Sequence, residues 1–145
     1  MTIKLPKASW LLSNIKRDSD PRGDILSIVD MKIQNVSIIT SNAKVIRSNH
    51  YHKKDFHFMY VLEGKIDYFF KKINDDRVNY LEVLKGDNIF TPNLEIHATY
   101  FPVTTKLIVS SGFPRDQETY ENDTVRVDFL NEDNIKEFLK KYAIK

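Results

Sequence analysis

The sequence contains no cysteine and only four glycines among its 145 residues. Without cysteine, disulfide bonds, thiolate nucleophiles and zinc–thiolate sites are excluded. The four glycines lie far apart, which also excludes the glycine-rich phosphate loops of P-loop and dinucleotide-binding proteins. The net charge is only +2 and the lysines occur in short scattered pairs, so the sequence offers no basic surface for nucleic acid.

Long hydrophobic runs are missing too. No stretch approaches the roughly 18 consecutive apolar residues of a transmembrane helix, and the N-terminus lacks the apolar run of a signal peptide. We therefore expect a cytoplasmic protein that does not bind membranes. The content of 41% hydrophobic and 29% charged residues is typical of a globular protein. Because the chain has no internal repeat or linker, we expect one domain over residues 1–145.

The middle of the chain has the pattern of many short strands separated by turn residues. The strand-like runs are rich in Val, Ile, Tyr and Phe. They lie at residues 25–29, 33–40, 43–51, 56–62, 65–70, 78–84, 88–90, 96–101 and 106–110. Short strands at near-regular spacing predict an antiparallel sandwich or barrel.

Only the C-terminal segment shows helical periodicity. Apolar residues recur there at i, i+3, i+4 and i+7, namely Ile135, Phe138, Leu139 and Tyr142. Residues that commonly cap helices precede them. The pattern predicts a helix over about residues 132–143, packed on the barrel or on a partner subunit.

The run at 56–62 is apolar on both faces. Side chains alternate along a strand, so His57, Met59 and Val61 share one face, while Phe56, Phe58, Tyr60 and Leu62 share the other. Both faces should be covered, either by an internal layer of a sandwich or by a second subunit. The Trp-Leu-Leu sequence at 10–12 fits an extra edge strand or a dimer anchor. We expect a homodimer.

Three of the four histidines lie within eight residues of one another. His50 and His52 are two apart on a predicted strand, so both rings emerge on one face. His57 follows a short turn where the next strand folds back, and His97 would join from a distant strand. Neutral imidazoles converging on one point suit Fe, Mn, Ni, Cu or Zn. The cluster predicts a site with a chemical role.

The spacing of these histidines resembles the two motifs of the cupin superfamily. The first motif is matched by His50, His52, His57 and Gly64, and the second by Gly86, Pro92 and His97. The resemblance spans roughly residues 20–112. It implies an all-β fold, an antiparallel jelly-roll β-barrel with its core at about 20–112, followed by the C-terminal helix. It also implies that His50, His52, His57 and His97 hold one divalent transition metal (Zn, Mn, Fe or Ni) in the barrel mouth.

The sequence departs from the cupin motifs at a few positions. Lys44 and Leu94 stand where glycine is usual, and His57 stands where the first motif has glutamate. The glycine replacements affect turns rather than chemistry. The replacement of glutamate by histidine keeps a metal-ligand type, so the resemblance implies an all-histidine site.

Three further segments are similar to nucleotide-sugar epimerases and ketoisomerases of the cupin superfamily, enzymes of surface-polysaccharide pathways. They are DPRGDIL at 20–26, RSNHYHK at 47–53, with Ser48 in place of glycine, and FPRDQETY at 113–120. The resemblance implies an isomerase or epimerase that moves a proton next to a carbonyl group of a sugar or nucleotide sugar.

Roles for individual residues follow from that chemistry. Arg47 and Lys53 are candidates to hold a phosphate or carboxylate of the substrate. Tyr60, Tyr68 and Tyr100 are candidate hydroxyl donors or stacking platforms, although we expect at least two of the three to be core-packing residues instead.

A histidine that binds a metal through the nitrogen facing the substrate cannot also take a proton. In a metal-free site, His50 or His52 would be the catalytic base. In a metalloprotein, which we expect because four histidines fill four ligand positions, the proton would pass to Tyr60, Tyr68 or a hydroxide on the metal.

Two other functions remain open at this point. An all-histidine site also suits a metal-dependent dioxygenase or lyase acting on a small organic acid. The third possibility is a cupin that binds a metal or a sugar without catalysis.

Overall fold

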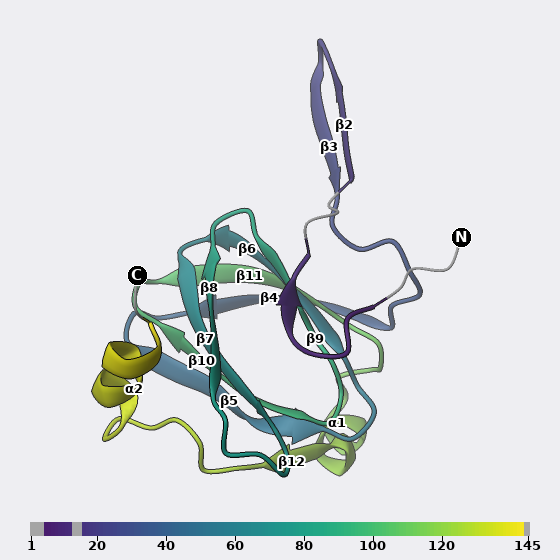
Figure 1. Cartoon of the computed structure of the whole chain (residues 1–145). Helices are drawn as coiled ribbons and strands as arrows, with labels where there is room; N and C mark the ends of the chain where they lie inside the picture. The colour runs from purple at the N-terminus through teal and green to yellow at the C-terminus, as the bar shows by residue number, and fades with distance from the viewer. Residues whose placement is uncertain (1–4, 13–15, 144–145) are drawn as a thin grey trace.

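Two five-stranded antiparallel sheets face each other, and a separate two-stranded hairpin projects from one end (Figure 1). The structure is a computed structural model that describes residues 5–12 and 16–143. The start of the N-terminal segment used above to expect a cytoplasmic protein lies outside these residues. Within them, no helix is long and apolar enough to cross a bilayer.

The chain crosses repeatedly between the two sheets. In order across the first sheet they are β1 (Trp10–Leu11), β9 (Asn88–Thr91), β6 (His57–Glu63), β11 (Thr105–Ser111) and β4 (Asn35–Ser41). Across the second sheet they are β12 (Thr124–Arg126), β5 (Val45–His52), β10 (Glu95–Phe101), β7 (Lys65–Lys72) and β8 (Asn79–Leu84). The projecting hairpin consists of β2 (Lys16–Asp20) and β3 (Gly23–Ser27). All nine predicted strand-like runs overlap a strand, which confirms the all-β antiparallel fold.

The main core fills the space between the two sheets. Alternate residues of the facing strands point inward and form one apolar cluster. It consists of Met59, Val61, Ile66, Tyr68, Phe70, Val83, Ile89, Phe101, Leu107 and Val109. This packing holds the strands that carry the histidines at a set separation.

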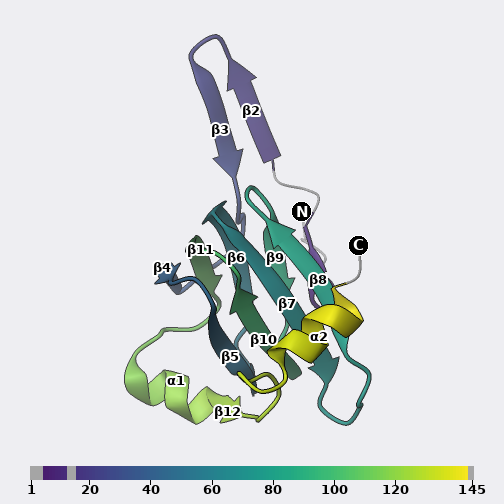
Figure 2. The same cartoon turned by 90° about the vertical axis from the view of Figure 1, so that its left-hand side faces the viewer.

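Helix α2 (Ile135–Tyr142) covers the outer face of the second sheet (Figure 2). Its Phe138 and Tyr142 rings pack on Phe69 of β7, at centroid distances of 5.6 and 6.4 Å. The backbone N–H of Asn134, just before the helix, donates to Asn131 Oδ1 at 3.0 Å. The predicted C-terminal helix and its packing on the barrel are therefore confirmed, with slightly shorter bounds.

Helix α1 (Gln117–Asp123) and strand β12 have no counterpart among the predicted elements. The Asp116 carboxylate caps α1 by accepting the N–H of Thr119 at 2.9 Å. Strand β12 then pairs with the end of β5, with Thr124 opposite His52 and Arg126 opposite His50. This pairing brings the segment after the barrel back to the histidines.

The positions that lack the family's glycine still adopt glycine-like backbone. Lys44, Ser48 and Leu94 have φ of 68°, 73° and 57°, respectively. The left-handed region costs a residue with a Cβ atom roughly 1–2 kcal/mol. The chain therefore keeps the turns of the motif and carries some backbone strain at each of them.

Replacing Leu94 by glycine should stabilise the protein by about 1 kcal/mol in urea or thermal unfolding, because it removes this strain. Leu94 is 53% exposed, so the substitution removes few packing contacts. The matched control is Lys85→Gly, at an exposed turn position without positive φ, which should lower stability by roughly 0.5–1 kcal/mol. Equal destabilisation by both variants would show that Leu94 is not strained.

Candidate functional site

Strands β5 and β10 bring three histidines together at one end of the barrel. His97 lies directly opposite His50 in the register, and His52 emerges on the same side of β5 as His50. The ring centroid of His50 is 4.6 Å from that of His52 and 4.7 Å from that of His97. One nitrogen of each ring lies within 4.8 Å of the other two, an arrangement that can hold a metal ion.

His57 reaches the same place from the other sheet, on β6. Its ring centroid is 4.7 Å from that of His52 and 6.5 Å from that of His97. Its Nδ1 lies 2.9 Å from Ser111 Oγ. All four histidine rings are therefore neighbours, but His57 does not belong to the group of three that could share an ion.

Burial favours the neutral form of all four imidazoles. Burial, followed by repulsion from His97 and His52, lowers the pKa of His50 to about 2. Burial also lowers the pKa of His97 to about 4 and the pKa values of His52 and His57 below their usual range. A neutral imidazole has a free lone pair, so it can bind a metal or accept a proton.

Asp123, the last residue of α1, orients His52. Its Oδ2 lies 3.5 Å from His52 Nδ1, and Thr124 Oγ1 lies 3.3 Å from the same nitrogen. The other carboxylate contacts of Asp123 are the backbone N–H groups of Lys54 and Asp55, at 2.8 and 3.1 Å. His52 Nε2, by contrast, is buried without a hydrogen-bond partner. A buried unpaired nitrogen is costly, and a metal ion or substrate group would satisfy it.

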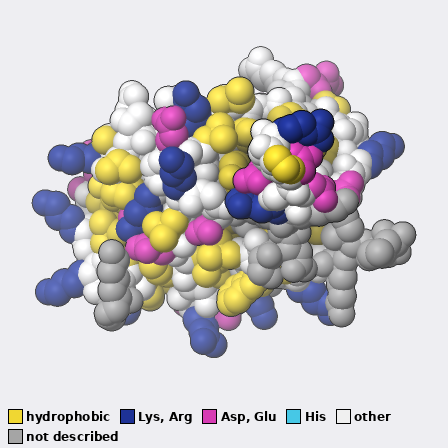
Figure 3. Space-filling model, turned by 90° about the horizontal axis from the view of Figure 1, so that it is seen from above, with side chains coloured by type: hydrophobic (Ala, Val, Ile, Leu, Met, Phe, Trp, Pro, Cys, Tyr) yellow, Lys and Arg dark blue, Asp and Glu magenta, His cyan; other side chains and the backbone are white. Residues whose placement is uncertain are grey.

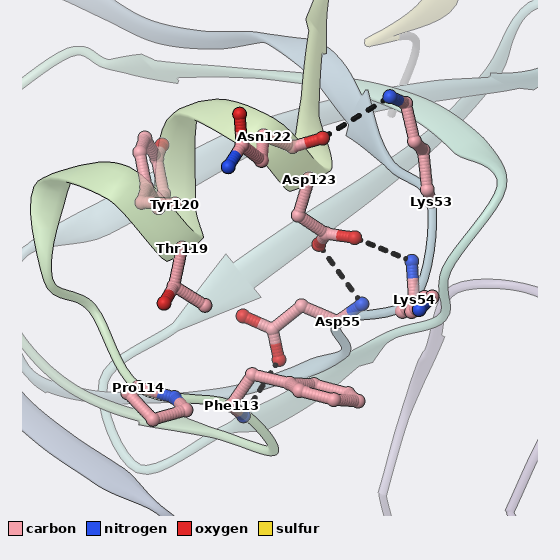
Figure 4. A pocket seen from close by; sticks show the side chains of 9 residues that line it. All are labelled: Lys53, Lys54, Asp55, Phe113, Pro114, Thr119, Tyr120, Asn122 and Asp123. Carbon is pink, nitrogen blue, oxygen red and sulfur yellow. Dashed lines mark hydrogen bonds between the residues drawn. The ribbon is translucent and has the colours of Figure 1, made fainter.

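A cavity of about 460 Å³ lies between the β5–β6 turn and α1 (Figure 4). It is lined by Lys53, Lys54, Asp55, Phe113, Pro114, Thr119, Tyr120, Asn122 and Asp123. No histidine lines it, but two of its lining carboxylates reach the cluster: Asp123 Oδ2 lies 3.5 Å from His52 Nδ1 and Asp55 Oδ2 lies 3.9 Å from His57 Nδ1. The Tyr120 ring links the cavity to the cluster, since its centroid lies 5.6 Å from that of His52. The Arg115 guanidinium stacks on the Tyr120 ring at 5.1 Å. The cavity thus combines apolar, aromatic and cationic groups.

The two predicted anion-binding residues lie in different places. Lys53 lines the cavity, and its Nζ donates to the Asn122 carbonyl at 3.1 Å. Arg47 donates through Nε to Ser41 Oγ at 2.8 Å and contacts the Thr40 carbonyl, so its guanidinium is held at the end of β4. The structure brings only Lys53 to the cavity.

Tyr68 lies next to His97 in the barrel core, and its hydroxyl group is already hydrogen-bonded. The side chain is fully buried, and its hydroxyl lies 2.7 Å from both Ser9 Oγ and Thr91 Oγ1. Burial raises its pKa further above the usual range. Its ring runs parallel to that of His97, at a centroid distance of 6.1 Å. Tyr68 therefore packs against the His97 ring on the side that faces the barrel core.

Tyr60 and Tyr100 point away from the histidines. Tyr60 is three residues from His57 on a regular stretch of β6, so it lies on the opposite face. Tyr100 packs in the cluster beneath α2. The structure therefore does not bring these two predicted residues to the cavity.

Several residues at the site were not singled out from the sequence. They are Asp55, Ser111, Arg115, Tyr120 and Asp123. Burial raises the pKa of Asp55 to about 6, and its carboxylate accepts the N–H groups of Phe56 and Phe113. The likeness of segment 113–120 to sugar epimerases was the one available signal, and it marked the segment without assigning roles to its residues.

Residues 18–101, more than half of the chain, match the family described as "Polysaccharide biosynthesis C-terminal domain". No curated protein sequence matches the chain.

Solved structures of sugar-modifying proteins share the fold. One is a mutant of the 3,4-ketoisomerase QdtA from Thermoanaerobacterium thermosaccharolyticum, solved in complex with TDP-4-keto-6-deoxyglucose. Its sequence is 20% identical and its TM-score is 0.67, and the match covers 97% of this chain and 100% of that one. A 3,4-ketoisomerase from Helicobacter canadensis is 14% identical with a TM-score of 0.67, covering 92% and 98%. CapF from Staphylococcus aureus, a capsular polysaccharide assembling protein, is 20% identical with a TM-score of 0.60, covering 79% of this chain and 34% of CapF. The expected cupin-type fold is confirmed.

Adding a divalent transition metal should raise the melting temperature of the wild-type protein. At free metal a hundredfold above Kd, the expected stabilisation is about 2.7 kcal/mol. His97→Gln should lose the shift, because it removes one of the three ligands. His57→Gln should keep it, because His57 lies outside the group. Loss of the shift in both variants would instead indicate a four-histidine site.

Proposed function

The chain belongs to the family of polysaccharide biosynthesis C-terminal domains, and we propose that it is a nucleotide-sugar isomerase that moves a proton next to the keto group of its substrate. The observation that carries the proposal is the set of four neutral histidines beside a cavity with apolar, aromatic and cationic walls. The fold shared with two 3,4-ketoisomerases supports this reaction class over the others.

A divalent transition metal fits His50, His52 and His97. The three rings are neutral and share one location, and His52 Nε2 lacks any other partner. Asp123 holds the opposite nitrogen of His52, which is the usual arrangement behind a metal-binding histidine. A metal held there would polarise the keto group and stabilise the negative charge of an enolate.

His57 is then the group that moves the proton. It is the one histidine of the cluster outside the metal-binding group, and it lies next to His52. The tautomer with its proton on Nδ1 donates to Ser111 Oγ and leaves a lone pair on Nε2. That nitrogen takes the proton from the hydroxyl-bearing carbon beside the keto group and returns it to the former keto carbon. The hydroxyl proton passes to the former keto oxygen, so the two carbons exchange their keto and hydroxyl groups.

The cavity provides groups for the rest of a nucleotide sugar. Lys53 and Lys54 line it, and Arg115 lies against Tyr120 at its wall. Cations of this kind bind a diphosphate, and the Tyr120 ring offers a stacking surface for a sugar or base. We also propose that the protein acts as a homodimer.

His57→Gln should reduce kcat by a factor of about 10² to 10⁴, the usual contribution of a general base. The assay follows TDP-4-keto-6-deoxyglucose in deuterated water by NMR, with deuterium entering at the carbon beside the keto group in the wild-type reaction. Lys140→Ala on α2 is the control and should keep wild-type activity, since this exposed residue lies on the element that packs against the far side of the second sheet.

Two outcomes would contradict this assignment. Full activity in verified metal-free protein would leave His52, with Asp123 behind it, as the base. Consumption of oxygen, with no exchange into any nucleotide keto-sugar, would favour the dioxygenase function.

Arg115→Ala and Lys53→Ala should each raise KM about tenfold or more while changing kcat little. Both cations would bind the diphosphate, which does not take part in the chemical step. Steady-state kinetics with the same substrate measure the effect. Arg47→Ala should not raise KM, because its guanidinium is held at the end of β4. An effect confined to Arg47 would place the diphosphate elsewhere.

A further inference from the structure

The side chains of strand β5 change faces partway along the strand. Near its start, Val45 packs against the core between the sheets, and Ile46 packs in the cluster beneath α2. Near its end, Tyr51 packs beneath α2, whereas His50 and His52 point into the barrel. In a regular strand, residues an even number of positions apart, such as Val45 and Tyr51, would share a face. The strand must therefore contain one extra residue between its two halves.

The extra residue is Asn49. In the pairing of β5 with β10, His50 lies opposite His97 and Ser48 lies opposite Ala98, so Asn49 has no counterpart on β10. Ser48 and Asn49 both have left-handed backbone, with φ of 73° and 58°. This is a β-bulge, and a shift of one residue turns every following side chain to the opposite face.

The bulge is the reason that both histidines of β5 lie inside the barrel. Without it, His50 and His52 would emerge on the face beneath α2, and neither could meet His57 from the facing sheet. As the structure stands, all four histidines are at most 9% exposed. No histidine is visible on the face that Figure 3 shows, at the hairpin end of the molecule.

The side chain of Asn49 also binds a segment far along the chain. Its Nδ2 donates to the Leu130 carbonyl oxygen at 2.8 Å, and its Oδ1 accepts the Leu130 N–H at 2.8 Å. We call these two hydrogen bonds the Asn49 clamp. The backbone carbonyl oxygen of Asn49 accepts the N–H of Val127 at 2.8 Å. Because Leu130 is only 2% exposed and packs beneath α2, the clamp ties the bulge to a buried part of the C-terminal segment.

The segment held by the clamp runs directly from β12, which lies beside the histidines. Arg126 of β12 lies opposite His50 in the register. Its guanidinium donates to both carboxylate oxygens of Glu121 on α1, at 2.9 and 2.8 Å. By holding the chain on both sides of this pairing, Asn49 connects the position of His50 to that of α1.

Asparagine suits this position for two reasons. It adopts left-handed backbone more readily than most residues other than glycine. Its side chain also offers both a donor and an acceptor, which the N–H and carbonyl groups of one residue require together. Glycine would keep the backbone conformation without the clamp, and aspartate would keep only the acceptor.

We propose that Asn49 is a positioning residue for the site: its bulge turns His50 and His52 into the barrel, and its clamp holds the bulge against the chain after β12. This rests on the proposed function, because the two histidines are among the residues that would hold the metal. Asn49 acts through them and takes no part in the chemistry. Strained backbone beside a functional site persists only where its surroundings hold it, and the clamp provides that hold.

The ring positions can be measured without metal or substrate. In metal-free protein with labelled histidine, NMR should show through-space contacts between the His50 and His97 rings, whose centroids lie 4.7 Å apart. Asn49→Val should lose these contacts, because a β-branched residue disfavours left-handed backbone and cannot form the clamp. The matched control is Lys44→Val, which introduces the same backbone conflict, at φ of 68°, just before β5 and away from the histidines. It should keep the contacts.

Two outcomes of the NMR experiment would overturn the proposal. One is persistence of the His50–His97 contacts in folded Asn49→Val protein. The other is their loss in both variants, because the effect would then follow from strain anywhere in β5 and not from the bulge.

Asn49→Gly tests the clamp by itself and avoids backbone strain that could prevent folding. It should weaken the His50–His97 contacts and raise the Kd for zinc, measured by titration calorimetry, about 10- to 100-fold, the usual effect of losing support behind a metal ligand. Asn49→Asp, which keeps the acceptor for the Leu130 N–H, should lie between this variant and the wild type. Unchanged ring contacts and an unchanged Kd in Asn49→Gly would show that the clamp has no positioning role. If the wild-type protein binds no zinc, the metal site of the proposed function is contradicted, while the ring contacts still decide the role of Asn49.

Discussion

The register between β5 and β10 sets His50 directly opposite His97, and the chemistry of the site depends on this pairing. Because the two strands pair directly in the same sheet, their backbone hydrogen bonds hold this separation. His52 follows on the same face of β5, and His57 reaches the cluster from the opposing sheet. Burial and the mutual repulsion of rings in so small a volume lower the pKa values of these histidines, which favours their neutral forms. Neutral imidazoles are what a metal site or a proton transfer requires.

The segment after the barrel adds two features to the histidine cluster: one wall of the cavity, and the Asp123 carboxylate that orients His52. Strand β12 pairs with the end of β5, so α1 lies over the barrel mouth. Asp123 then reaches His52 and also accepts two backbone N–H groups of the β5–β6 turn. One carboxylate thus connects the position of the His52 ring to the shape of the cavity. The same segment supplies the aromatic and cationic residues beside it.

The outer faces of the two sheets differ in how their apolar residues are covered. One face is covered by α2 through aromatic packing within the chain. The other ends at an edge strand with exposed aliphatic residues and continues into a hairpin without support. In the proposed homodimer, a partner subunit on this edge would give it the cover that α2 gives the second sheet. The site at the opposite end would remain open to substrate.

Local patterns in the sequence were sufficient to predict most of the strands, the C-terminal helix and the clustering of the histidines, because alternation and helical periodicity depend on near neighbours. The same alternation already placed Tyr60 on the face opposite His57. The roles of Asp123, Tyr120 and Arg115 depended on β12 pairing with β5, a contact across about 70 residues that no local pattern encodes. Likewise, only the packed structure placed Lys53 at the cavity and tied Arg47 to β4. Local preference determined the elements, and long-range pairing decided which side chains meet.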